Sequence, residues 1–169
     1  NNYHSSEITM ETHNQEPLEL NNGVYTFGGV NLLELLADDD PDHKTPLYIY
    51  DLGIVKRQAQ RLIDAIPWEN KKLLFAMKQN FNPSIIQAVH RLGYGIDAVS
   101  VNEIKWSIEC GVSPDEILFT GNNMTDDEMR EAVKLGIRLN IDSLSRLIKY
   151  GTAYPGTKVF VRINPDIVA

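Results

Sequence analysis

Apolar and polar positions alternate in a regular order from residue 45 onward. Six short apolar stretches have the character of strands, and each except the last is followed by an amphipathic stretch. The predicted strands lie 21 to 26 residues apart and begin at Leu47, Leu73, Tyr94, Glu116, Ile137 and Lys158. Such even alternation predicts an α/β fold with parallel strands joined by right-handed crossovers, either a doubly wound sheet or a barrel of eight units.

The amphipathic stretches predict five connecting helices, which cover residues 54–65, 83–91, 101–110, 126–135 and 143–150. A glycine falls at or just past the end of each of the last four. Glycine at such a position adopts the left-handed conformation without a steric penalty. We therefore expect Gly93, Gly111, Gly136 and Gly151 to lie just past the C-termini of four of the helices.

The pattern before residue 45 is different. Residues 1–16 are polar without periodicity, and we expect a disordered tail there. Residues 23–30 predict a short strand and residues 32–36 a helix. The aspartate-rich run 38–42, which contains a proline, is expected to end that helix in a solvated turn.

Lys78 lies at the end of an apolar stretch, residues 73–80, that otherwise predicts a buried strand. Alternation would place Leu74, Ala76 and Lys78 on one face of this strand. A desolvated lysine is shifted toward its neutral form, which is a nucleophile that condenses with aldehydes. The alternative is that Lys78 has left the sheet and reaches into water.

Other strands carry polar residues at comparable positions. Asp97, Asn140 and Arg162 lie near the ends of the third, fifth and sixth predicted strands. In a barrel they would converge with Lys78 inside the carboxyl ends of the strands, where barrel enzymes place their chemistry. A doubly wound sheet fits less well, because the turn at 51–54 lacks the glycine-rich dinucleotide fingerprint. We therefore predict a (β/α)8 TIM-type barrel with its first six strands present.

The composition of the chain limits the classes of molecule that it is expected to bind. The chain has 169 residues, 43% of them hydrophobic, and a net charge of -7, which disfavours nucleic acid and anionic membranes as partners. No apolar run approaches membrane-spanning length, and Cys110, the single cysteine, suits a reducing compartment. His4 and His13 lack companion ligands, so no metal is expected. These features favour a cytoplasmic protein that acts on small molecules.

Seven segments, in order along the chain, resemble the pyridoxal-phosphate enzymes of the alanine-racemase and decarboxylase fold type. Within that family they are most similar to the branch that converts meso-diaminopimelate to L-lysine, the last step of lysine biosynthesis. The segments are residues 28–35, 45–51, 75–80, 94–103, 120–123, 140–143 and 161–165.

The resemblance implies a role for each candidate residue. Lys78 would carry pyridoxal 5'-phosphate as a Schiff base, which an amino-acid substrate displaces before it loses carbon dioxide. Asp97 would favour the protonated Schiff base, and Arg162 would join it in a hydrogen-bonded network. Ser100 and Asn140 would support the cofactor. A structural hydrogen bond or helix cap for Asp97, and an interior ion pair for Arg162, are the simpler alternatives.

The resemblance also implies a domain organisation and an assembly. Residues 17–44 would begin a β-domain that a later segment completes, and residues 45–169 would form a truncated cofactor-binding barrel. We expect this chain to be the N-terminal piece of a longer enzyme, inactive by itself. The complete enzyme would be a homodimer with shared active sites.

Four alternatives remain open from the sequence. The enzyme could decarboxylate ornithine, arginine or carboxynorspermidine, or it could be a racemase that removes an α-proton. A third possibility is a non-catalytic pyridoxal-phosphate-binding barrel. The fourth is a structural remnant in which Lys78 carries no cofactor.

Overall fold

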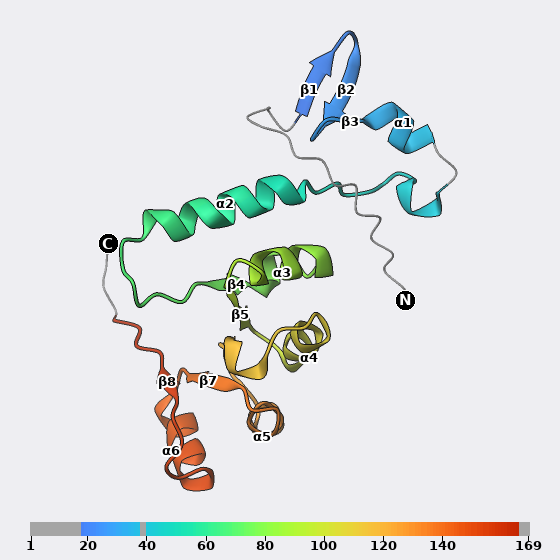
Figure 1. Cartoon of the computed structure of the whole chain (residues 1–169). Helices are drawn as coiled ribbons and strands as arrows, with labels where there is room; N and C mark the ends of the chain where they lie inside the picture. The colour runs from blue at the N-terminus through green and yellow to red at the C-terminus, as the bar shows by residue number, and fades with distance from the viewer. Residues whose placement is uncertain (1–17, 38–39, 166–169) are drawn as a thin grey trace. The chain divides into compact units, whose positions relative to one another are not determined.

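A computed structural model describes residues 18–37 and 40–165, which form two compact units that meet in sequence between Ile66 and Pro67 (Figure 1). The predicted tail, residues 1–16, lies outside the described residues. The predicted division at residue 45 between a β-domain segment and a barrel remains a prediction.

The first unit contains a small antiparallel sheet. Its strands lie in the order β1 (Leu18–Asn21), β2 (Val24–Phe27) and β3 (Val30–Asn31). The single strand predicted over residues 23–30 is therefore wrong. Gly28 and Gly29 both adopt positive φ, 57° and 81°, and turn the chain between β2 and β3.

The remaining elements of this unit are helical. The predicted helix is confirmed as α1 (Leu32–Ala37), and the short 3-10 helix η1 (Pro41–His43) follows. Asp40 caps η1 by accepting a hydrogen bond from the Asp42 amide at 2.9 Å, as expected of an aspartate-rich turn.

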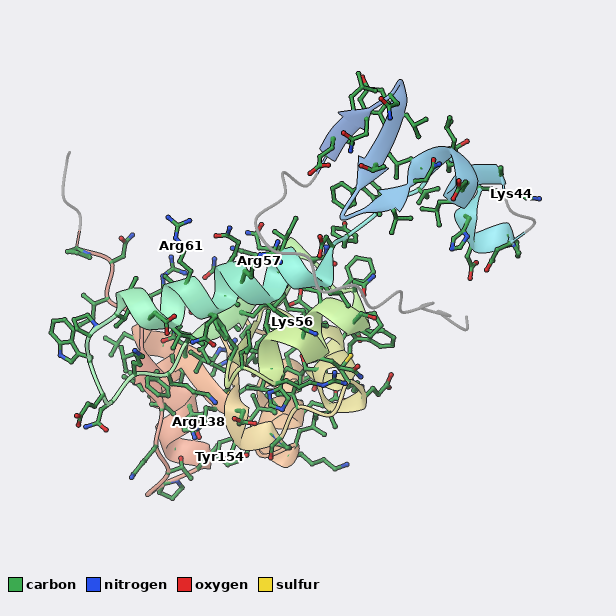
Figure 2. All side chains as sticks on the ribbon, turned by 45° about the horizontal axis from the view of Figure 1, so that its top comes forward. Lys44, Lys56, Arg57, Arg61, Arg138 and Tyr154 are labelled. Atoms are coloured by element: carbon green, nitrogen blue, oxygen red, sulfur yellow. The ribbon has the colours of Figure 1, made fainter. Side chains whose placement is uncertain are left out.

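The strand predicted to begin at Leu47 is wrong. Residues 47–50 form no strand pairing in the described part of the chain, and Tyr48 is 89% exposed. An extended segment becomes a strand only where a neighbour supplies ladder hydrogen bonds. The predicted helix that follows is confirmed as α2 (Leu52–Ala65), and Figure 2 shows Arg57 and Arg61 on it, both exposed.

The second unit is built on a five-stranded parallel sheet. Its strands lie side by side in chain order: β4 (Leu74–Ala76), β5 (Gly95–Ala98), β6 (Ile117–Phe119), β7 (Arg138–Ile141) and β8 (Phe160–Val161). In a doubly wound sheet the strand order changes direction at one point, whereas in a barrel each strand lies next to the one before it in the chain. The α/β class and five of the six predicted strands are thus confirmed.

Four helices connect these strands, and α3, α4 and α5 lie on one side of the sheet (Figure 1). They are α3 (Pro83–His90), α4 (Val101–Glu109), α5 (Asp126–Lys134) and α6 (Leu144–Ala153). Each begins after a residue whose side chain accepts a hydrogen bond from a first-turn amide: Asn82, Ser100, Thr125 and Ser143.

The glycine predictions are confirmed at three positions and wrong at one. Gly93, Gly111 and Gly136 have φ values of 91°, 92° and 78°. Gly151 instead lies inside α6, and the left-handed glycine comes later, at Gly156. Glycine within a helix costs only about 1 kcal/mol relative to alanine, which continued helix formation readily offsets.

Alternation along β5, β6 and β7 separates an apolar face from a polar one. The apolar residues are almost fully buried and pack with residues of the helices to form the core. They include Ile96, Ala98, Ile117, Phe119, Leu139 and Ile141, together with Ile86, Ile104 and Ala132. Asp97 and Asn140 lie on the opposite, polar face of the sheet.

Gly95 lies where β5 passes closest to its neighbours. A Cβ atom there would clash with the Glu116 carbonyl oxygen and would come within 2.7 Å of Leu74 Cδ2. We expect Gly95→Ala to lower the free energy of unfolding by about 1–3 kcal/mol or more. Gly151→Ala is the matched control, because its Cβ meets nothing within 4 Å, and we expect it to stabilise the protein by about 0.5–1 kcal/mol. Denaturant unfolding measures the stability of both variants. Equal changes in the free energy of unfolding would contradict the close packing inferred at Gly95.

Asp126 joins the first turn of α5 to α6. Hydrogen bonds from Arg146, and then from Lys149, hold the pKa of Asp126 below its ordinary value of 3.8. A lowered native pKa gives stability that is present above the ordinary value and is lost as pH falls through the native one. We expect Asp126→Asn to lower the urea midpoint at pH 7, and this difference from wild type to shrink progressively below about pH 4.

The adjacent Asp127 provides the control, because its side chain is 88% exposed and pairs with Arg130 of its own helix. We expect Asp127→Asn to change the midpoint less at pH 7. A difference for Asp126→Asn that stayed constant from pH 7 to pH 3 would show that the carboxylate charge is not the cause.

Candidate functional site

The carboxyl ends of the parallel strands surround an open cavity of about 580 Å³. This volume lies within the range of small-molecule binding sites. Seven residues line the cavity, all from the second unit: Lys78, Asp97, Val99, Thr120, Asn122, Asn140 and Arg162. Four of the five predicted site residues are therefore brought together.

Lys78 reaches the cavity by a different route from the one predicted. β4 ends at Ala76, and Lys78 lies in the 3-10 helix η2 (Met77–Gln79). Within this turn Met77 is 1% exposed and its sulfur lies 3.2 Å from the Ser107 hydroxyl oxygen, whereas Lys78 is exposed. The predicted burial of Lys78 is wrong, because the turn sends Met77 into the core and leaves the lysine at the open cavity.

Asp97 and Arg162 have different partners from those expected. Asp97 accepts a hydrogen bond from the Thr120 hydroxyl, and Arg162 Nη1 donates to Asn122 Oδ1 at 3.0 Å. No hydrogen bond or ion pair joins Asp97 to Arg162 in the described residues, so the predicted network between them is not formed. The cavity instead presents a carboxylate and a guanidinium that are each held by a neutral side chain.

The structure places the two remaining predicted residues differently. Asn140, on β7, lines the cavity and adds an amide that can both donate and accept hydrogen bonds. Ser100 does not line it. The Ser100 hydroxyl caps α4 by accepting a hydrogen bond from the Glu103 amide at 3.2 Å.

Thr120 and Asn122 are site residues that the strand pattern could have revealed. They follow β6 at alternate positions, as Asp97 and Val99 do at the end of β5. The Thr120 amide donates to the Ala98 carbonyl at 2.8 Å, so the pairing of the two strands continues to this point. The fourth predicted strand, which begins at Glu116, corresponds to β6. If its alternation of side chains continues one residue past the end of β6, Thr120 falls on the same face of the sheet as Asp97 and beside it.

Lysine, aspartate and arginine side chains around the carboxyl ends of sequential parallel strands define a barrel-type site for a small anionic or carbonyl ligand. Comparison with known proteins identifies the protein family. Residues 52–169 match the family described as pyridoxal-dependent decarboxylase, pyridoxal binding domain, and the chain belongs to this family.

Relatives and solved structures agree with this assignment. The diaminopimelate decarboxylase of Methanothermobacter thermautotrophicus is 37% identical over 156 residues, which cover 90% of this chain and 36% of the relative. That of Zymomonas mobilis is 33% identical and is covered to 37%. The crystal structure of diaminopimelate decarboxylase from M. jannaschii superposes with a TM-score of 0.76 and 29% identity, over 90% of this chain and 37% of that one. The chain thus spans little more than a third of these relatives.

None of the helices in the described ranges is both long and apolar enough to cross a membrane.

Proposed function

We propose that this chain supplies the cofactor-binding wall of an enzyme that decarboxylates meso-diaminopimelate to L-lysine. The observation that carries the proposal is Lys78 at a cavity shared with Asp97 and Arg162, within the segment that matches the pyridoxal binding domain. The proposal is supported by the relatives, which are diaminopimelate decarboxylases, and by the crystal structure of the M. jannaschii enzyme in complex with L-lysine.

The residues around the cavity fit pyridoxal 5'-phosphate. The primary amine of Lys78 can bind the aldehyde of the cofactor covalently, and a cavity of about 580 Å³ has room for a ligand of this size. When bound, the cofactor supplies a conjugated ring that accepts electrons from the carbon losing its carboxylate.

The chain's own residues control charge and orientation. The Asp97 carboxylate lines the same cavity as Lys78 and can accept a hydrogen bond from a donor on a bound group. Arg162 offers hydrogen-bond donors for an anionic oxygen, and Asn140, on the neighbouring strand β7, can orient a polar group through its amide. Val99 gives the cavity an apolar edge.

A second candidate is decarboxylation of another basic amino acid, such as ornithine, arginine or carboxynorspermidine. It is favoured by the ornithine decarboxylase of Entamoeba histolytica, which superposes with a TM-score of 0.61 and 28% identity over 68% of this chain. Assaying the complete protein for carbon dioxide release with each amino acid decides between them. We expect release from meso-diaminopimelate, and turnover of α-hydrogen without release would instead indicate a racemase.

We further propose that the complete enzyme is a cytoplasmic homodimer, in which residues 17–44 contribute to a β-domain. Its support is the family membership, the buried free thiol of Cys110, and the separate small sheet β1–β3. Light scattering on the complete protein should give twice the mass of one chain, and a monomeric mass would contradict the dimer.

A further inference from the structure

Two opposite charges line the same cavity without pairing with each other. A carboxylate and a guanidinium form one of the strongest hydrogen-bonded pairs in proteins, often through two parallel bonds. Yet the described contacts of Asp97 and Arg162 are with Thr120 and Asn122. Both partners are neutral, and both come from the segment that follows β6.

From this arrangement we propose that Thr120 and Asn122 are positioning residues, which hold Asp97 and Arg162 apart so that each charge remains available to a group bound in the cavity. This inference rests on the proposed function for the identity of that group. A neutral donor such as the Thr120 hydroxyl satisfies an oxygen of Asp97 without cancelling its charge, whereas an arginine would neutralise it.

The local structure fixes Thr120 beside Asp97. In the parallel register of β5 and β6, Asp97 lies opposite Leu118, so position 120 is the next position on the same face. The Thr120 amide remains tied to the Ala98 carbonyl at 2.8 Å. The hydroxyl therefore reaches the carboxylate from a backbone that belongs to the sheet.

Gly121 then sets the position of Asn122. A Cβ atom at residue 121 would lie 2.6 Å from Cε2 of the Phe119 ring and 3.1 Å from the Val99 carbonyl oxygen. The backbone consequently packs closely on the end of β5 before it reaches Asn122. The amide of Asn122 faces the cavity, where it accepts the hydrogen bond from Arg162 at the end of β8.

The test compares Thr120→Val with Thr120→Ser in the complete protein, because valine keeps the shape and loses the hydroxyl, whereas serine keeps the hydroxyl. In crystals grown without cofactor, we expect Asp97 of the valine variant to turn within hydrogen-bond distance of Arg162, and the serine variant to match wild type. After addition of pyridoxal phosphate, we expect the pH midpoint of the cofactor absorbance to fall by about one unit in the valine variant only.

Asn122→Ala provides an independent route to the same result, since this exposed position tolerates truncation without loss of the fold. We expect Arg162 to turn toward Asp97 in this variant as well. The inference is overturned if Asp97 and Arg162 remain apart in the crystals of either variant, or if the absorbance midpoint of Thr120→Val equals that of wild type. If wild type takes up no pyridoxal phosphate, the proposed function fails, and the crystal structures still decide whether Thr120 and Asn122 separate the charges.

Discussion

Lys78→Ala is expected to abolish covalent uptake of pyridoxal phosphate and to lower kcat of the complete enzyme by at least about 10³-fold. Lys78 is the only lysine among the residues that line the cavity of the described structure, so no second amine is placed to take over. The absorbance of the protein after addition of the cofactor measures the uptake, and carbon dioxide release measures the activity.

Lys78→Arg is the matched control for charge. Arginine keeps a cation at the same turn but remains protonated, and therefore cannot serve as the amine that binds an aldehyde. We expect Lys78→Arg to be as inactive as Lys78→Ala, whereas Lys72→Ala, an exposed lysine paired with Glu116 outside the cavity, should retain wild-type activity. Substantial activity in Lys78→Arg would show that Lys78 acts through its charge and would contradict the proposed role.

The sequence predicted the parallel strands well because their apolar residues are buried in the core. Ile96, Ile117 and Leu139 are each at most 1% exposed, so their pattern reflects a strong and local physical demand. The segment 47–50 has similar β-propensity, yet pairing depends on a neighbouring strand, and the sequence of the segment carries no information about that neighbour.

The errors around the site have a common cause. The sequence predicts that period-2 alternation continues through Lys78, but β4 ends at Ala76 and Lys78 lies in a 3-10 turn. A short turn leaves little trace in hydrophobic patterning, so the sequence predicts a buried Lys78 on the strand, whereas the structure places an exposed Lys78 at the cavity. Likewise, the pattern placed Asp97 and Arg162 at one cavity, but it could not show that neutral side chains would separate them, because hydrogen-bond choice depends on three-dimensional distance.

The largest expected effect on stability lies directly beneath this cavity, at Phe119. Its ring is 1% exposed in the core, on the opposite face of β6 from Thr120, and it contacts the position of Gly121. Phe119→Ala removes buried apolar surface and leaves a cavity, so we expect it to lower the free energy of unfolding by about 3–5 kcal/mol in denaturant titrations.

Phe81→Ala separates this packing effect from the simple loss of an aromatic ring. The Phe81 side chain is 64% exposed, and the hydrogen bond that Trp106 Nε1 donates to residue 81, at 2.8 Å, goes to the backbone carbonyl that alanine retains. We expect the free energy of unfolding of this variant to change by no more than about 0.5 kcal/mol.

The same pair of variants tests the link between the core and the cavity. Because Phe119 supports Gly121 from the core side, Phe119→Ala should also release the 120–122 segment and weaken cofactor binding, whereas Phe81→Ala should leave cofactor binding unchanged. A loss of stability for Phe119→Ala as small as the one expected for Phe81→Ala would show that the core does not depend on Phe119, and that the cavity residues are held in place by other contacts.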